Sequence, residues 1–231
     1  MKTIDNRDFT LTETLDRLAV ETVDRAGDLG VDDVEVAISS GNGLSVTVRG
    51  GACETVEHQR DKSLAITVYD GGRKGTATSS DFSAQALTDS IAAAKRIADY
   101  AESDPCAGLA EPEFLAREIP ELELDHPWEI DAEAAFVKAL ECERAALSFD
   151  QRIKQSDGCS VNRYRGARAY ANSHGFHGVY RGTRHSMSAI MIGDDVDGMQ
   201  SGYWYSAARD PEDLEPPDAI GTTAARRTIA K

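Results

Sequence analysis

Basic and aromatic side chains gather in one stretch of this 231-residue chain, residues 152–185. The stretch holds seven arginine or lysine residues and a single acidic residue, with tyrosines between them. Arginine and tyrosine are favoured at protein interfaces because they combine contact area with hydrogen bonding. We predict that a surface for a partner protein or a peptide is formed by Arg163, Arg165, Arg168, Tyr170, Arg181 and Arg184.

Three uses of this stretch stay open. On an alternating strand, Arg163 and Arg165 share one face, and Tyr164, Arg168 and Tyr170 share the other. Such a sheet could bind single-stranded nucleic acid, meet an acidic partner, or neutralise the chain's own acidic helices. The formal net charge of −15 disfavours nucleic acid, because a field of that sign repels phosphates.

Sequence motifs for metal binding and for nucleophilic catalysis are missing. The five histidines form no HExxH, HExxxH or HxxEH arrangement. The nearest pair, His174 and His177, lies in strand-forming sequence, where positions three apart face opposite ways. No GxSxG, P-loop or GxGxxG is present, and residues 194–198 lack the distal glutamate of a calcium loop. We assign no catalytic residue and no metal ligand, and expect no cofactor in this chain.

Composition places the chain among ordinary globular proteins, with 41% hydrophobic and 28% charged residues. The four cysteines form no CxxC pair, which fits reduced thiols in the cytoplasm. The first residues lack the apolar core of a signal peptide, and no apolar run is long enough to span a bilayer. We therefore expect a cytoplasmic protein that does not contact membranes.

Hydrophobic periodicity predicts a helix, an antiparallel meander and a second helix in the first half. Apolar residues recur at helical spacing over 11–29 and 87–101, the second run following a candidate N-cap at Ser83. Alternation between them predicts strands at 34–38, 44–48, 64–68 and 76–78. Glycine-containing turns are predicted at 41–43, 50–51 and 70–72.

The second half repeats this outline after a proline-rich linker, residues 104–127. A helix is predicted from Asp131, strand-like segments at 159–172, 175–193 and 199–208, and a last helix from near Pro217. We predict an α+β fold of two helix–antiparallel-meander–helix domains, 1–103 and 128–231, with a weak internal duplication. The last helix has no Gly, Asn or Pro to end it before Lys231, so we expect the chain to be part of a longer protein.

Several long strings resemble the PmbA/TldD family. The run at residues 38–83 resembles its first domain and reads ISSGNGLSVTVRGGACETVEHQRDKSLAITVYDGGRKGTATSSDFS. Two strings resemble its linker: DPCAGLAEP and DHPWEI. Three resemble its second domain: YANSHGF, YRGTRHSMS and DGMQSGYWYSAARDPEDLE. The similarity covers nearly the whole chain from about residue 15 and is closer to the PmbA-like (TldE) branch than to the TldD branch.

This resemblance implies a cytoplasmic zinc metallopeptidase built from two related subunits and acting on unfolded peptides or peptide precursors. It also implies a C-terminal β domain that the matched region does not contain. TldD-like members carry a His-Glu-x-x-x-His zinc motif beyond that region, and PmbA-like members generally lack it. We therefore expect a non-catalytic subunit, inactive alone, that pairs with a TldD-type protein carrying the zinc.

Other functions stay open beside this one. An older label for the family, modulator of DNA gyrase, suggests a nucleic-acid or gyrase-associated binding module using residues 152–185. Such a module would show a steep salt dependence of binding. The chain could also be a peptidase on its own, or a truncated product without activity.

Overall fold

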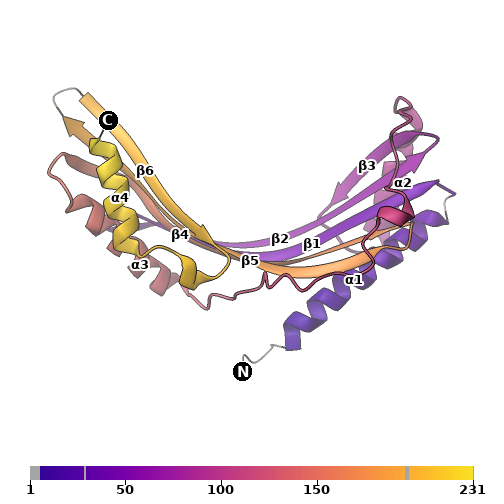
Figure 1. Ribbon diagram of the computed structural model, residues 1–231, viewed down its shortest axis with the longest axis horizontal. Helices are drawn as coiled ribbons and strands as arrows, with labels where there is room; N and C mark the ends of the chain where they lie inside the picture. The colour runs from indigo at the N-terminus through magenta and orange to yellow at the C-terminus, as the bar shows by residue number, and fades with distance from the viewer. Residues whose placement is uncertain (1–5, 29, 196–197, 231) are drawn as a thin grey trace. The chain divides into compact units, whose positions relative to one another are not determined.

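The computed structural model of the chain describes residues 6–28, 30–195 and 198–230 (Figure 1). The helices are α1 (Asn6–Gly27), α2 (Ala84–Tyr100), α3 (Ala132–Leu147) and α4 (Pro217–Ile229). The strands are β1 (Asp33–Arg49), β2 (Ala52–Asp70), β3 (Arg73–Ser79), β4 (Ile153–Asn172), β5 (His177–Asp195) and β6 (Gly198–Ala208). Two short 3-10 helices complete the order, Pro112–Phe114 and Pro211–Asp213. The predicted α+β class is confirmed.

All the described strands belong to one sheet, in the order β3-β2-β1-β4-β5-β6. Antiparallel pairing places Leu64 opposite Ser79 in β2–β3 and His185 opposite Ala208 in β5–β6. The two predicted meanders are therefore not separate sheets, because β1 and β4 pair with each other at the middle of the order. The element order α-β-β-β-α occurs twice along the chain, as the predicted duplication requires.

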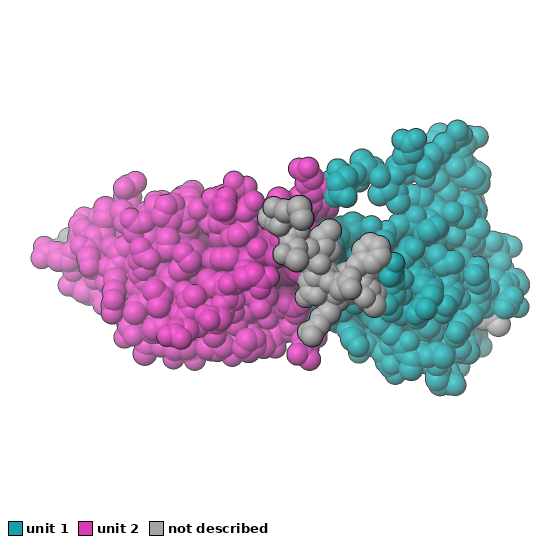
Figure 2. Space-filling model, turned by 90° about the horizontal axis from the view of Figure 1, so that it is seen from below, with its two compact units in different colours: residues 1–41, 61–122, 166–181 teal, residues 42–60, 123–165, 182–231 magenta. Residues whose placement is uncertain are grey.

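Two compact units make up the chain (Figure 2). Unit 1 comprises residues 1–41, 61–122 and 166–181, and unit 2 comprises residues 42–60, 123–165 and 182–231. Strands β1, β2, β4 and β5 each contribute residues to both units. Each unit thus takes strands from both halves of the sequence, and the domain limits at 103 and 127 stay a prediction.

In unit 1, helices α1 and α2 cover one face of the sheet. Alternate residues of the strands turn toward these helices and form one buried core, because a strand directs successive side chains to opposite faces. The core residues are Leu15, Ala19, Val23 and Ala26 of α1; Val34, Val36 and Ile38 of β1; Leu64, Ile66 and Val68 of β2; Leu87, Ile91, Ala94 and Ala98 of α2; and Ala167, Ala169 and Ala171 of β4. Helix α2 begins at the predicted cap, where the Oγ of Ser83 accepts a hydrogen bond from the N–H of Ala86 (3.3 Å).

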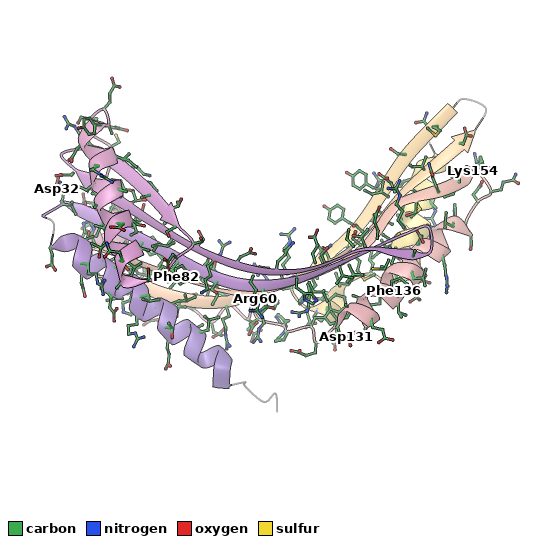
Figure 3. The ribbon with its side chains drawn as sticks, turned by 180° about the vertical axis from the view of Figure 1, so that it is seen from behind. Asp32, Arg60, Phe82, Asp131, Phe136 and Lys154 are labelled. Atoms are coloured by element: carbon green, nitrogen blue, oxygen red, sulfur yellow. The ribbon has the colours of Figure 1, made fainter. Side chains whose placement is uncertain are left out.

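In unit 2, helices α3 and α4 lie side by side over the sheet (Figure 1). Their core includes Leu44, Val46 and Val48 of β1; Ala135, Ala139, Cys142 and Ala146 of α3; Cys159 and Val161 of β4; Met187, Ala189 and Met191 of β5; and Ile220, Ala224 and Ala225 of α4. The predicted cap of α3 is confirmed, since Asp131 accepts a hydrogen bond from the N–H of Ala134 (2.8 Å; Figure 3). No helix in the described ranges is long and apolar enough to cross a membrane.

Glycines let helix and strand backbones touch at equivalent places in the two halves. A Cβ at Gly75 in β3 would collide with the backbone of Ala94 in α2, and one at Gly202 in β6 would lie 2.7 Å from the backbone nitrogen of Thr228 in α4. A Cβ at Gly221 would likewise collide with the carbonyl oxygen of Cys142, where α4 crosses α3. These contacts fix how closely each helix approaches its neighbours.

The predicted turn at residues 41–43 is wrong, because β1 runs unbroken from Asp33 to Arg49. A Cβ at Gly43 would lie 3.3 Å from the carbonyl oxygen of Arg163, so this glycine permits a close approach within the sheet. The other two glycine turns are confirmed. Positive φ angles occur at Gly50 (61°) and Gly51 (77°), and likewise in the β2–β3 turn.

We expect Gly221→Ala to destabilise the chain by about 1–3 kcal/mol, because the added methyl group must push α4 away from α3. Chemical denaturation would measure the loss. Gly27→Ala at the end of α1 is the matched control: nothing lies within 4 Å of the new Cβ. Because alanine favours helix, the control should be neutral or gain about 0.5–1 kcal/mol. Equal effects of the two substitutions would contradict the close contact.

Candidate functional site

Two of the predicted surface arginines hold a segment of their own chain, residues 123–131, which we call the docked segment. Arg165 binds Asp125 with two parallel hydrogen bonds, Nε to Oδ1 and Nη2 to Oδ2, each 2.8 Å. Arg163 donates from Nε to the carbonyl oxygen of Ile130 (3.3 Å) and from Nη1 to Oδ1 of Asn42 (3.2 Å). The bidentate pair is mostly shielded from solvent, since its side chains are 25% and 21% exposed. This geometry is strong and directional.

The docked segment also lies along β5 before His185, the residue at which the pairing of β5 with β6 starts. The N–H of Thr183 donates to the carbonyl oxygen of Leu124 (2.9 Å), and the N–H of His126 donates to Oγ1 of Thr183 (3.0 Å). Thr183 Oγ1 also donates to the carbonyl oxygen of Arg209 (2.9 Å). The linker was predicted to be irregular, and this part of it is irregular yet fixed by tertiary hydrogen bonds.

Two histidines complete this contact. His126 places Nδ1 3.1 Å from Oδ2 of Asp210, and its backbone oxygen bonds to Nε2 of His185 (2.9 Å). The His185 ring is buried and meets Trp128 edge-on, with centroids 5.4 Å apart. Burial lowers the pKa of His185 below its ordinary value. The neutral ring therefore acts as part of the packing.

Tyr170 lies in unit 1 and serves a different cluster. Its hydroxyl donates to Oε2 of Glu35 (2.9 Å), while the hydroxyl of Tyr69 donates to Oε1 of the same carboxylate (2.9 Å). Burial, together with the hydrogen bond to Glu35, raises the pKa of Tyr69 to about 12. Phe176 packs against the ring of Tyr170. The tyrosine predicted for a partner surface thus joins three strands of its own sheet.

The six predicted surface residues divide between the two units. Arg163, Arg165 and Arg184 belong to unit 2, and the other three, Arg168, Tyr170 and Arg181, belong to unit 1. Arg168 and Arg184 are exposed, and Arg181 is half-buried. That these six form one partner surface stays a prediction.

Part of the basic stretch is neutralised within the chain, although the acidic partners, Asp125 and Asp150, lie outside the helices that were predicted to supply them. Besides the Arg165–Asp125 pair, Arg152 binds Asp150 through Nε and Nη2, each at 3.0 Å. These side-chain hydrogen bonds, with one from the Arg152 backbone, lower the pKa of Asp150 to about 2. Two of the seven basic residues, Arg152 and Arg165, thus bind acidic groups of the same unit.

The histidines singled out by the sequence hold the β4–β5 hairpin and α1. His174 bonds through Nε2 to Asp33 (2.8 Å) and through Nδ1 to the carbonyl oxygen of Ala110 (2.9 Å). His177 bonds through Nδ1 to Asp16 of α1 (3.1 Å). In the described ranges, no three His, Cys, Asp or Glu side chains converge to hold a metal ion. The acidic loop at 194–198 lies partly outside the described residues.

Glu143 of α3, which is 1% exposed, was not predicted as a functional residue. Its two oxygens accept hydrogen bonds from the backbone of the β1–β2 turn, from Gly50 N–H (2.9 Å) and Gly51 N–H (2.7 Å). A signal was available, because Glu143 continues the buried small-residue face of Ala135 and Ala139 at helical spacing. A glutamate on such a face needs buried donors.

Two buried thiols, one of them on this helix, lie next to each other in unit 2. Cys142 of α3 and Cys159 of β4 are both buried, whereas Cys53 and Cys106 are exposed. Contact with Cys142, and then burial, raises the pKa of the Cys159 thiol. A thiol held neutral in this way is a poor nucleophile. The pair therefore belongs to the core of unit 2.

Family models match most of the chain. A model described as PmbA/TldA metallopeptidase central domain matches residues 125–231, and one described as PmbA/TldA metallopeptidase domain 1 matches residues 34–98. Residues 125–131 of the docked segment fall within the first match. The basic stretch at 152–185 does so as well.

Curated relatives agree with these models. Metalloprotease PmbA of Escherichia coli O157:H7 is 42% identical over 200 residues, which is 87% of this chain and 44% of the relative. The Metalloprotease PmbA homolog of Haemophilus influenzae is 38% identical over 213 residues, covering 92% of this chain and 46% of the relative. The chain thus spans less than half the length of these relatives.

Solved structures show the same fold at lower identity. A candidate modulator of DNA gyrase from Bacteroides thetaiotaomicron superposes with a TM-score of 0.84 at 23% identity, over 93% of this chain and 49% of that one. TldE from Thermococcus kodakarensis superposes with a TM-score of 0.75 at 19% identity, over 91% of this chain and 47% of that one. At these identities the likeness concerns the fold alone.

We expect Asp125→Ala to lower the free energy of unfolding by about 1–3 kcal/mol, because it leaves Arg165 without its bidentate partner. The docked segment should also become cleavable, so limited proteolysis within residues 123–131 should speed up. Glu118→Gln, an exposed carboxylate in the preceding stretch, is the control and should change stability by less than about 0.5 kcal/mol. Unchanged proteolysis in Asp125→Ala would contradict the docking.

A pH dependence follows from His185. Because its folded-state pKa lies below the ordinary 6.5, the unfolded chain binds the proton more tightly, and stability falls as pH falls. We expect the free energy of unfolding to drop more in the wild-type chain than in His185→Gln between about pH 7.5 and about pH 5.5. Urea denaturation at each pH would measure both. The exposed His58→Gln should behave as wild type, and identical slopes in all three chains would refute the assignment.

Proposed function

Because the chain belongs to the PmbA/TldD metallopeptidase family, we propose that it is the non-catalytic part of a two-subunit zinc peptidase. A TldD-type subunit would supply the zinc and the catalytic glutamate. This chain would shape access to that site and hold peptide substrates. We place this activity in the cytoplasm, in the maturation or degradation of unfolded peptides and peptide precursors.

The observation that supports this proposal is that the histidines bond to separate partners within the chain. Zinc peptidase sites take imidazole nitrogens that converge on one point. Here His126, His174 and His177 each bond to an aspartate on a different element, and His185 bonds to a backbone oxygen. Among the residues that the structure describes, no set of side chains therefore fits a zinc site. In the proposed complex, activation of water by the metal belongs to the partner.

A nucleic-acid or gyrase-associated role is the second candidate, and the charge distribution supports it less. Arg163 and Arg165 bind the docked segment, and Arg152 binds Asp150. These contacts remove cations from the surface that such a role needs. A salt-dependent affinity for oligonucleotides, lost in Arg168→Glu and Arg184→Glu, would revive it.

We expect the purified chain to cleave no unstructured peptide alone and to support cleavage when mixed with a TldD-type partner. Chelation of zinc should abolish that cleavage. A partner in which glutamine replaces the motif glutamate is the control, since it keeps the subunit contact but loses the general base. Cleavage by this chain alone that survives repurification would contradict the proposal. So would a partner whose activity this chain does not change.

A further inference from the structure

The docked segment is held at His126 through all four polar groups of that residue. Its N–H donates to Oγ1 of Thr183 (3.0 Å), and its carbonyl oxygen accepts from Nε2 of His185 (2.9 Å). Its ring nitrogens lie 3.1 Å from Oδ2 of Asp210 and 2.7 Å from the carbonyl oxygen of Glu123. Glu123 has a positive φ of 48°, a conformation that costs free energy in a residue other than glycine. The segment therefore relieves backbone strain when these bonds fail.

The bond from His185 depends on the charge of its ring. The ring is buried, and Nε2 faces the carbonyl oxygen of His126, which can only accept. Nε2 therefore carries the proton of the neutral ring, and Nδ1 holds the lone pair. Among the residues that the structure describes, Nδ1 is buried without a hydrogen-bond partner. A proton added at Nδ1 would create a buried charged donor that has no acceptor, which costs free energy.

The ionisable groups around this ring belong to three elements. Arg163 of β4 and His126 of the docked segment oppose a positive charge on His185, whereas Asp210, which follows β6, favours it. The carboxylate of Asp210 already contacts the ring of His126. Ala208 of β6 lies opposite His185 and carries no charge. The surroundings therefore give the protonated ring little compensation.

Further charged groups on these elements have partners of their own. Arg165 of β4 binds Asp125 of the docked segment, and Arg209, which follows β6, donates to the carbonyl oxygen of Thr183 (3.3 Å). These groups are therefore engaged while the segment is docked.

One contact of the docked segment gains in acid, because a protonated His126 attracts Asp210 more strongly. The two side chains are 28% and 33% exposed, and ion pairs open to solvent contribute little. A buried charged donor without an acceptor costs more than such a pair contributes. The net effect of acid is therefore set by His185.

We propose that His185 is an acid-operated release for the docked segment: protonation of its buried ring drives residues 123–131 away from β5 and uncovers Arg163 and Arg165. Strands β4, β5 and β6 around the ring are paired in one sheet, whereas the docked segment is irregular and held by a few hydrogen bonds. The segment therefore opens at the least cost. Trp128 of this segment meets the ring edge-on, so its departure lets water reach Nδ1. In acid, two side chains predicted for a partner surface become free to bind.

The direction of the pH effect follows from proton linkage. Burial lowers the pKa of the docked His185 below 6.5, and the ring of the released form returns toward that ordinary value. Release therefore takes up a proton. Between the two pKa values, the ratio of released to docked chains rises by up to about tenfold for each pH unit that the pH falls.

The two tryptophans make the release measurable in the whole chain by fluorine NMR after labelling with fluorotryptophan. Trp128 lies in the docked segment, and Trp204 packs against the core of unit 2. Trp128→Phe identifies the first resonance. From about pH 7.5 to about pH 5, we expect the Trp128 resonance to move toward that of free fluorotryptophan. The Trp204 resonance should stay in place, because the core of unit 2 remains folded.

His185→Gln is the decisive variant, because glutamine keeps an N–H donor for the carbonyl oxygen of His126 and takes up no proton. Its Trp128 resonance should stay at the docked position down to about pH 5. His58→Gln removes an exposed histidine of β2 and should behave as the wild type. Asp125→Ala removes an anchor of the segment without changing His185, so its release should begin at a higher pH than in the wild type.

A Trp128 resonance that stays at the docked position in the wild type at about pH 5 would overturn the inference. So would a joint movement of Trp128 and Trp204, which would mean that unit 2 unfolds. Release of His185→Gln at the wild-type pH would assign the proton to another group. If His185→Gln does not fold, equal release in the wild type and Asp125→Ala would refute the inference. The measurement needs neither partner nor zinc, so its outcome is independent of the proposed function.

Discussion

In each unit, two helices cover one face of the sheet, and the described ranges place no helix on the other face. Side chains on the helix side are small or branched, because backbones meet at Gly75, Gly202 and Gly221. Polar side chains on the open side must find partners among themselves. Glu35 between two tyrosine hydroxyls, and Thr47 beside Ser160 at 2.9 Å, are the result. One-sided coverage thus determines both the packing and the polar contacts.

Carboxylates complete the backbone where sheet pairing stops. In unit 2 the buried Glu143 accepts from both glycine N–H groups of the β1–β2 turn, and in unit 1 Asp32 accepts from Gly71 N–H of the β2–β3 turn (2.8 Å). The docked segment serves β4 and β5 through other groups: Asp125 binds the guanidinium of Arg165 in β4, and the carbonyl oxygen of Leu124 accepts from the N–H of Thr183 in β5. An acidic chain can use its charge to hold turns and edges, because backbone N–H groups stabilise a carboxylate.

Local chemistry could be predicted from the sequence, and contacts between distant residues could not. The helix caps Ser83 and Asp131 and the turn at Gly50–Gly51 follow from neighbouring residues, and all are confirmed. The segment 41–43, wrongly predicted to be a turn, has the glycine and asparagine residues that are typical of a turn. What distinguishes it is the approach of Arg163, more than a hundred residues away. A separation of 40 residues likewise hid Asp125 as the partner of Arg165, although the charge arithmetic allowed for internal neutralisation.

The sharing of strands between units has a consequence for inheritance. The core of unit 1 needs Ala167, Ala169 and Ala171 from the second half of the gene, and the core of unit 2 needs Val46 and Val48 from the first. Recombination between two diverged genes at the proline-rich linker would place mismatched side chains in both cores at once. Selection should therefore keep the two halves together as one inherited block.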